Sequence, residues 1–138
     1  MIAKVKLDNG AFMPERAHST DAGADLRTPK DFTLHPDSTA IIHTGVHIET
    51  PENCVAMVKS KSGLNIRHGI TTTGVIDEGF TGEIVVKMIN HGNDCVEFKR
   101  GDKITQIVIL PVYYPEFELV DEIDGGERGD NGYGSTGR

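Results

Sequence analysis

The stretch Gly74-Val75-Ile76-Asp77-Glu78-Gly79-Phe80-Thr81-Gly82 places one carboxylate and one aromatic ring at a sharp bend between two apolar runs. Apolar runs of strand length that are broken by Gly and Asp indicate a β-hairpin. Such a hairpin would hold Asp77 and Phe80 side by side, which suits gripping a flat or ring-shaped ligand with a water beside the carboxylate. The alternative is an ordinary turn in which Asp77 caps its own backbone.

Short apolar runs recur along the rest of the chain, at residues 2–7, 39–48, 54–58, 84–89, 95–98 and 104–112. Turn-forming clusters separate these runs, and no long segment has the helical period of 3.6 residues. The pattern predicts an all-β sandwich or barrel with one short helix around residues 63–67. Residues 104–110 should form a central strand, in which the amide of Gln106 needs a hydrogen-bond partner.

Composition narrows the class of protein. The 138 residues are 37% hydrophobic, which fits a single domain. A net charge of −7 argues against non-specific nucleic-acid binding, although a nucleotide needs only a few local cations and backbone N–H groups. The two cysteines, Cys54 and Cys95, adjoin apolar strand residues, so we expect buried free thiols in a reducing compartment.

Neither a membrane-spanning run nor a signal peptide is evident in the sequence. We therefore expect a soluble intracellular domain, or a fragment that is already mature. The histidines show no metal-ligand spacing, although His43 and His47 would share one face of a strand. Because CxxC, HExxH and P-loop patterns are all missing from the sequence, neither a zinc site nor a P-loop is expected.

The last 18 residues, 121–138, hold six of the sixteen glycines and a single aliphatic residue, Ile123. Such a tail cannot bury enough apolar surface to fold by itself, and a disordered tail is one interpretation. The other is a lid over a phosphorylated ligand, because the glycines of residues 132–137 let the backbone wrap closely around an anion. Arg128 could then grip phosphate oxygens, and Tyr133 could stack.

Two more clusters suit a phosphate. Ser62 and Gly63 stand at the start of the predicted helix beside Lys61, where backbone N–H groups and the helix end can bind an anion; a simple Ser N-cap is the alternative. In Asp21-Ala22-Gly23-Ala24-Asp25-Leu26, a carboxylate could hold Mg²⁺ or its waters. We prefer Asp25 to Asp21 because Asp25 adjoins a strand-like residue, although turn capping would also explain both.

Five stretches in this order resemble the motifs of the trimeric dUTPase family (dUTP nucleotidohydrolases), and the resemblance covers nearly the whole chain. The five are Asp21 to Leu26, Lys61-Ser62-Gly63-Leu64, Gly74 to Gly82, Gly101-Asp102-Lys103-Ile104-Thr105-Gln106, and Arg128 to Gly137. One such motif alone would be weak evidence. Five at family-like spacing are strong evidence.

The resemblance implies a jelly-roll-like β-barrel over residues 1–120 and a flexible Gly-rich arm over residues 121–138. It implies a cytoplasmic homotrimer, of a prokaryote or a phage-infected cell, that binds neither nucleic acid nor membrane. Each active site would take its phosphate-binding motifs from one subunit, its hairpin from a second and its lid from a third. The implied reaction is Mg²⁺-assisted attack of water at the α-phosphate of dUTP, which gives dUMP and pyrophosphate. It would limit uracil incorporation into DNA and supply dUMP for dTMP synthesis.

The resemblance also implies roles for the residues of the hairpin. Asp77 would be the general base that orients the attacking water, and it would accept a hydrogen bond from the deoxyribose 3′-hydroxyl. Phe80 would pack under the sugar and leave no room for a 2′-hydroxyl. Backbone groups around Thr73, Gly74 and Ile76 would read the edge of uracil, and the narrow hairpin would exclude the methyl group of thymine.

The remaining motifs would bind the triphosphate and its metal. The phosphates near the α-position would be contacted by Lys61, Ser62, Gly63 and Gln106. Asp25 would hold a water of the Mg²⁺ shell. In the tail, Tyr133 would stack on uracil. The γ-phosphate would be clamped by Arg128, Ser135 and Thr136, with Gly134 beside them.

This sequence departs from the family pattern at three positions. Lys61 stands where Arg is usual and loses the bidentate fork. Phe80 stands where Tyr is usual, and Tyr133 where Phe is usual, and both keep an aromatic plane. We therefore expect altered affinity rather than lost activity.

Two other functions are weighed against dUTP hydrolysis. The dCTP deaminase group has a similar hairpin but carries a catalytic Glu in the next strand, where this chain has Lys87. Glu83 lies close by but matches the Glu of the dUTPase motif. A regulatory module that binds other proteins through its loops is the second alternative, and the short chain has no evident insertion to support it.

Overall fold

The structure is a computed structural model that describes residues 1–132 and 137. Over these residues the chain forms nine strands and one short helix. They are β1 Lys4–Leu7, β2 Gly23–Arg27, β3 Phe32–Leu34, β4 Thr39–Glu49, β5 Cys54–Lys59, α1 Ser62–His68, β6 Ile70–Ile76, β7 Glu83–Asn90, β8 Val96–Phe98 and β9 Lys103–Pro111. The predicted all-β, jelly-roll-like fold is confirmed.

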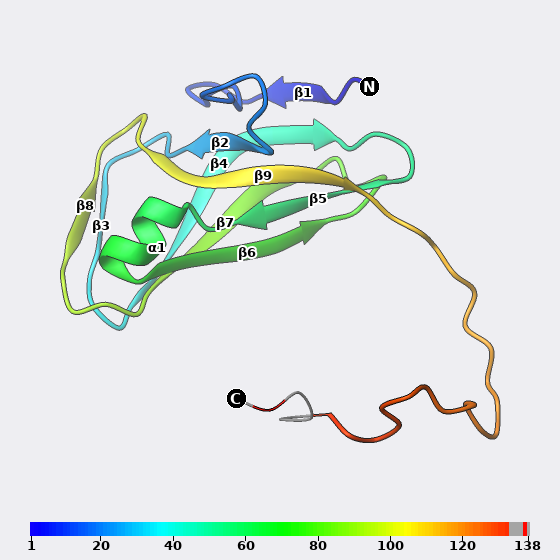
Figure 1. Cartoon of the computed structure of the whole chain (residues 1–138). Coiled ribbons are helices and arrows are strands. Elements are labelled where there is room, and N and C mark those ends of the chain that lie inside the picture. Colours follow the sequence, from blue (N-terminus) through cyan, green and yellow to red (C-terminus); the bar gives the residue numbers. More distant parts are fainter. Residues whose placement is uncertain (133–136, 138) are drawn as a thin grey trace.

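Seven strands form one curled sheet in the order β1-β4-β7-β6-β5-β9-β2. The strands β3 and β8 pair separately, and Figure 1 shows them beside α1 at one end of the sheet. As predicted, β9 is internal, because it pairs with β5 on one side and β2 on the other. The helix predicted at residues 63–67 is confirmed as α1.

Strand alternation builds the core. Every second residue of β7 points inward, so that Ile84, Val86 and Met88 are at most 3% exposed. The same period places Ile42 and Val46 of β4 in the same core. Full burial of one such aliphatic side chain stabilises the fold by about 1.5–3 kcal/mol, which is why the strand period predicts the inner face of the sheet.

The predicted hairpin around Asp77 joins two antiparallel neighbours, β6 and β7, but its arms are open near the bend. β6 pairs with β7 only far from the bend, where Ile70–Thr72 lie opposite Met88–Asn90. Nearer the bend, β6 instead follows β5, and β7 follows β4. The two arms diverge because each is the neighbour of a different strand in the curled sheet. We call residues 77–82, which join these arms, the Asp77 turn.

The two cysteines have different environments. Cys54 is buried and free, as predicted, but Cys95 is exposed, and the expectation that it is buried is wrong. It precedes β8, which is paired only with the short strand β3, so no second layer covers it. Its Sγ lies 3.2 Å from His35 Nδ1.

In the described part of the chain, no helix is long and apolar enough to span a membrane.

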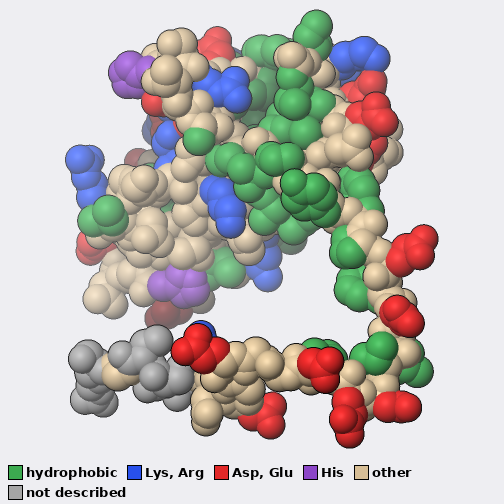
Figure 2. Space-filling view, turned by 45° about the vertical axis from the view of Figure 1, so that its right-hand side comes forward, with side chains coloured by type: hydrophobic (Ala, Val, Ile, Leu, Met, Phe, Trp, Pro, Cys, Tyr) green, Lys and Arg blue, Asp and Glu red, His purple; other side chains and the backbone are tan. Residues whose placement is uncertain are grey.

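Beyond β9 the chain leaves the barrel. Figure 1 shows this segment running away from the sheet, and residues 113–132 are exposed throughout. Near its root, the Tyr114 hydroxyl donates a 2.7 Å hydrogen bond to Glu78 Oε2 in the Asp77 turn. Figure 2 shows acidic side chains spaced along the rest of the segment.

Candidate functional site

Four residues, two of them from the first and fourth motifs, stand in one row across the sheet. Asp25 of β2 lies opposite Gln106 of β9, Gln106 lies opposite Lys59 of β5, and Lys59 lies opposite Thr73 of β6. Directly opposed residues of antiparallel strands project on the same face. Lys61 follows β5 by two residues, so the first, second and fourth motifs meet at this end of the sheet.

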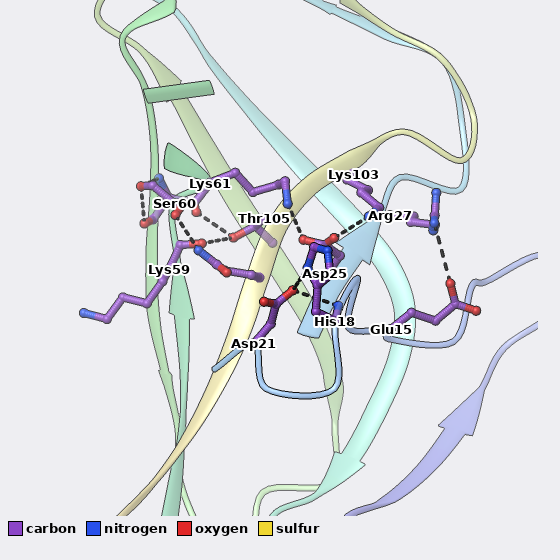
Figure 3. A network of polar contacts seen from close by, with 12 residues as sticks. Glu15, His18, Asp21, Asp25, Arg27, Lys59, Ser60, Lys61, Lys103 and Thr105 are labelled. Atoms are coloured by element: carbon purple, nitrogen blue, oxygen red, sulfur yellow. Dashed lines mark hydrogen bonds and ion pairs between the residues drawn. The ribbon is translucent and has the colours of Figure 1, made fainter. Parts of the chain in front are cut away.

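The centre of this group is the carboxylate of Asp25, which is only 6% exposed. Its Oδ1 accepts a hydrogen bond from Lys61 Nζ, and its Oδ2 lies 2.7 Å from Lys103 Nζ (Figure 3). Burial by itself would raise the pKa of Asp25, but the hydrogen bonds from Lys103 and Lys61 outweigh it and hold the pKa below its ordinary value. Asp25 is therefore ionised near neutral pH.

Buried hydroxyl groups fix the turn that carries Lys61. Ser60 Oγ donates to the Thr72 carbonyl at 3.0 Å and accepts the Thr72 N–H at 2.9 Å. Thr105 Oγ1 donates to the Lys59 carbonyl at 2.8 Å. The Gln106 amide, which is predicted to need a hydrogen-bond partner, donates from Nε2 to the Ser60 carbonyl at 3.0 Å. These bonds join β5, β6 and β9 directly beneath the site.

A cavity of about 440 Å³ opens over this group; we call it the lysine pocket. Its lining consists of Ala17, Asp21, Ala22, Gly23, Asp25, Lys59, Lys61, Lys103, Gln106 and Val108. The lining contains three lysines and two aspartates, so it carries a net positive charge although the whole chain is acidic. A pocket of this charge suits an anionic ligand such as a phosphate chain.

Asp77 does not lie in the lysine pocket. It lines a separate depression of about 490 Å³ with Glu78, Gly79 and Tyr114. Four residues of strand separate Thr73, in the row of the pocket, from Asp77, which corresponds to about 13 Å along β6. Within one chain, the carboxylate proposed as the base and the cationic pocket are therefore apart.

The other residues predicted in the hairpin lie on this same arm and turn. Phe80 is 48% exposed, and its ring lies over Gly82, where an added Cβ would be 2.6 Å from the ring Cζ. Thr73, Gly74 and Ile76 pair with β5 on one side only, because the β7 pairing stops at Thr72. Because the strands diverge, this segment makes no inter-strand hydrogen bonds to β7.

The second motif begins α1. Ser62 and Gly63 are exposed at its first turn. The N-cap is Lys61 rather than Ser62, so the alternative in which Ser62 caps the helix is wrong. No side chain caps this helix start, and the Lys61 side chain contacts Asp25.

The first-motif carboxylates have different tasks. Asp21 Oδ2 accepts the backbone N–H of His18 at 3.0 Å, and this bond is the main reason that the pKa of Asp21 is lowered. Asp21 therefore serves its own turn, as the alternative for it predicted.

Arg128 lies in the exposed segment, where its Nη2 donates to the Gly132 carbonyl at 2.9 Å. Tyr133, Gly134, Ser135 and Thr136 lie outside the described residues.

Sequence reasoning missed Lys103 and Lys59 as pocket residues. Lys103 belongs to the quoted fourth motif, but its contact with Asp25 depends on the register of β2 against β9, which shifts between Leu26 and Arg27. Such a cross-strand pairing has no short-range signal in the sequence. Charged residues at the ends of apolar strands would have been the nearest clue.

The donor set indicates how a divalent cation would be held. Among residues 1–132 and 137, no three His, Cys, Asp or Glu side chains cluster as metal ligands. Mg²⁺ keeps most of its waters and binds largely through substrate phosphates. The ionised Asp25 carboxylate has lone pairs beyond the two that its lysines use, so it fits a contact to a metal-bound water.

The model of the family described as dUTPase matches residues 9–137. The chain belongs to the dUTPase family. A deoxyuridine 5′-triphosphate nucleotidohydrolase of Gloeothece citriformis is 43% identical over 135 residues, which cover 96% of this chain and 93% of that relative. The mouse protein of the same name is 38% identical and covers 97% of this chain and 83% of that relative.

Solved dUTPase structures share the fold. The dUTPase of Staphylococcus bacteriophage 80alpha with dUPNHPP has a TM-score of 0.92 at 30% identity, covering 99% of both chains. A mutant dUTPase of phage phi11 of S. aureus, described with a structural Mg(II) ion, has a TM-score of 0.81 at 29% identity, covering 88% of this chain and 98% of that one. The family resemblance of the five motifs is thereby confirmed, and the chain is a dUTP diphosphatase.

Proposed function

We propose that the chain hydrolyses dUTP to dUMP and pyrophosphate by Mg²⁺-assisted attack of water at the α-phosphate, in a homotrimer whose sites form between subunits. The observation that carries this proposal is the separation of the lysine pocket from the Asp77 turn within one chain. A phosphate pocket and a base that lie apart in one chain can act on one substrate if the base comes from a second copy.

The lysine pocket is proposed to hold the triphosphate. Lys61 and Gln106 line it, and Ser62 and Gly63 follow directly at the exposed start of α1. For the Lys61 ammonium to reach a phosphate, it must share or leave its contact with Asp25. Lys103 then remains on the carboxylate, so the buried charge of Asp25 keeps a partner.

The open side of β6 is proposed to bind the nucleoside. On the side without the β7 ladder, the backbone groups that β6 turns outward have no strand partner, and backbone groups around Thr73, Gly74 and Ile76 would read the edge of uracil. Phe80, half exposed at the turn, would pack against the deoxyribose and exclude a 2′-hydroxyl. Asp77 would orient the attacking water as general base and accept the 3′-hydroxyl.

Mg²⁺ would neutralise the triphosphate and the pyrophosphate leaving group. Asp25 would hold it through a water molecule, which agrees with a carboxylate that is ionised and already fixed by two lysines. The structural Mg(II) ion of the phage phi11 dUTPase supports a role for this metal in the family.

We further propose that residues 121–138 are an arm that closes a site of the trimer over residues 1–120 of other subunits. The exposed segment after β9, which Figure 1 shows running away from its own barrel, supports an arm that reaches another subunit. Arg128, Ser135 and Thr136 would clamp the γ-phosphate beside Gly134, and Tyr133 would stack on uracil. The reaction would limit uracil incorporation into DNA and supply dUMP for dTMP synthesis.

The test is pyrophosphate release with Mg²⁺ from dUTP, dTTP, dCTP and UTP, by the full chain and by a chain truncated after Gly126. We expect release from dUTP alone and its loss on truncation. Equal release from UTP would contradict the sugar-exclusion role of Phe80. Ammonia release from dCTP would contradict pyrophosphate release as the reaction and would indicate deamination. We expect none, because Lys87 stands where the deaminases carry their catalytic Glu.

A further inference from the structure

His47 of β4 lies between two hydrogen-bond acceptors at the base of the Asp77 turn. Its Nδ1 is 3.0 Å from the carbonyl oxygen of Thr81, and its Nε2 is 3.0 Å from Asp8 Oδ2. The side chain is only 19% exposed. Neither a carbonyl nor an ionised carboxylate can donate a proton, so both contacts are hydrogen bonds only if both ring nitrogens carry hydrogen. This arrangement of two acceptors favours the imidazolium form.

Asp8, on the far side of the ring, is held by a backbone contact with β4. β4 has a bulge between His43 and His47, with Gly45 at φ +68°. The Gly45 carbonyl accepts the Asp8 N–H at 2.8 Å, so the bulge itself places the Asp8 carboxylate. An added Cβ at Gly45 would lie 2.9 Å from Ala11 Cβ, and thus the bulge and the loop after β1 fit closely.

The second acceptor of the His47 ring, the Thr81 carbonyl, lies in the Asp77 turn, which we assign to substrate binding. Thr81 follows Phe80 directly and is four residues from Asp77. Because β7 begins only at Glu83, the Thr81 carbonyl lies outside the β4–β7 ladder, and His47 is the side chain that ties it to β4.

We propose that His47 is a positioning residue: its doubly protonated ring braces the Asp77 turn against Asp8, and loss of one ring proton releases the brace. The inference rests on the proposed role of the Asp77 turn. Loosening this turn would misplace both the base and the aromatic ring, and such misplacement is costly because catalysis depends on near-attack geometry.

The charged groups around the ring favour the imidazolium. Asp8 lies in direct contact, and Glu83 faces His47 from β7 but is held by His43 Nδ1 and by the Gly45 N–H. Lys6 of β1 lies opposite His47 and opposes its charge, but its own Nζ is 3.5 Å from Asp8 Oδ1. In sum, the hydrogen bonds to Asp8 and then to Thr81 raise the pKa of His47. The brace is consequently present at low pH and lost as pH rises through this raised pKa.

The experiment measures kcat/KM for dUTP from pH 5.5 to 9 in the full chain and in three variants. His47→Gln should lower kcat/KM about tenfold below the His47 pKa and abolish the alkaline limb that titration of the ring produces. Asp8→Asn keeps an acceptor but removes the charge, so it should move this limb down by about one pH unit. His43→Gln, the matched control on the same strand, should keep the limb.

A second measurement observes the ring in the intact protein and uses a variant only to assign its signals. Imidazole ¹⁵N shifts of the intact protein, with the His47 signals assigned by their absence in His47→Gln, should show two protonated nitrogens at pH 6 and a pKa above 6.5. A neutral His47 ring at pH 6 would overturn the proposal, and so would a His47→Gln enzyme with the wild-type pH profile. Asp77→Asn is measured in parallel: if it retained full activity, the proposed role of the turn would fail, whereas the ring titration would still decide whether the brace exists.

Discussion

Two carboxylates of this enzyme have opposite surroundings. Asp25 is buried between two lysines, whereas Asp77 stands on an exposed turn beside a shallow depression. A buried and paired carboxylate can hold a fixed charge, and an accessible one can exchange a proton with water. The pair fits a division of labour in which Asp25 holds the metal shell and Asp77 acts on the attacking water.

The role of Asp77 predicts the kinetics of its amide. Asp77→Asn keeps the shape of the side chain but removes its basicity, so kcat should fall about 10²–10⁴-fold, the usual contribution of a general base. KM for dUTP should change little. Steady-state pyrophosphate release measures both constants, and an Asp77→Asn enzyme with wild-type kcat would show that another group activates the water.

The pairing of Asp25 predicts a pH-dependent stability. Because its pKa is below the ordinary value of 3.8, its contribution to the free energy of unfolding is present above that value and is lost as pH falls through the folded-state pKa. Asp25→Asn, which leaves Lys61 and Lys103 without their carboxylate, should cost roughly 1–3 kcal/mol at pH 7.

Urea unfolding at pH 7 and at pH 3 checks this expectation. The difference between wild type and Asp25→Asn should shrink at the lower pH. The exposed arm carboxylate Asp124 supplies a control, since Asp124→Asn should change the free energy of unfolding by less than about 0.5 kcal/mol. A constant difference at the two pH values would contradict the lowered pKa of Asp25.

At this scale, the sequence predicts the residue types of the pocket better than their contacts. The motifs single out Asp25, Lys61 and Gln106, and the structure brings all three into one cavity. Lys103 escapes prediction because a register shift between β2 and β9 decides its partner. The exposure of Cys95 escapes prediction because an apolar neighbour does not reveal whether a second layer covers the strand.

At the scale of elements, the site depends on β5, β6 and β9 keeping their register. The buried hydroxyls of Thr72 and Thr105 are 2.7 Å apart, and Thr105 also donates to the Lys59 carbonyl at 2.8 Å. One side chain thus links three strands beneath the lysine pocket. Regular patterns predict most of the strands, but β2 and β3 are short and partly polar, and only their pairing with β9 and β8 makes them strands.

This link predicts the effect of an isosteric change. Thr105→Val removes the hydrogen-bond partner of the buried Thr72 hydroxyl and of the Lys59 carbonyl, so it should lower the free energy of unfolding by about 1–3 kcal/mol. The same substitution at the exposed Thr33 of β3 should change it by less than about 0.5 kcal/mol. Chemical denaturation of both variants makes the comparison, and equal stabilities would show that the three-strand link is dispensable.

At the scale of the whole molecule, the two parts of the proposed site lie apart in one chain. Its lysine pocket and its Asp77 turn share no lining residue. Several large apolar side chains are also exposed on its strands, among them Ile41, Val75, Val85 and Leu110. Assembly would cover such surface and bring the pocket of one copy to the turn of another. A single-chain pattern could not predict this, because motif order along a sequence does not say which copy supplies each motif.

The most direct test of this account mixes two inactive variants. Asp77→Asn spoils the turn, and Lys61→Ala combined with Gln106→Ala spoils the pocket. The two proteins are unfolded together, refolded as a one-to-one mixture and assayed for pyrophosphate release from dUTP. If each site joins a pocket and a turn from different chains of a trimer, random mixing should restore about a quarter of wild-type activity. A mixture as inactive as its separate components would contradict the account, because it would place both parts of each site in the same chain.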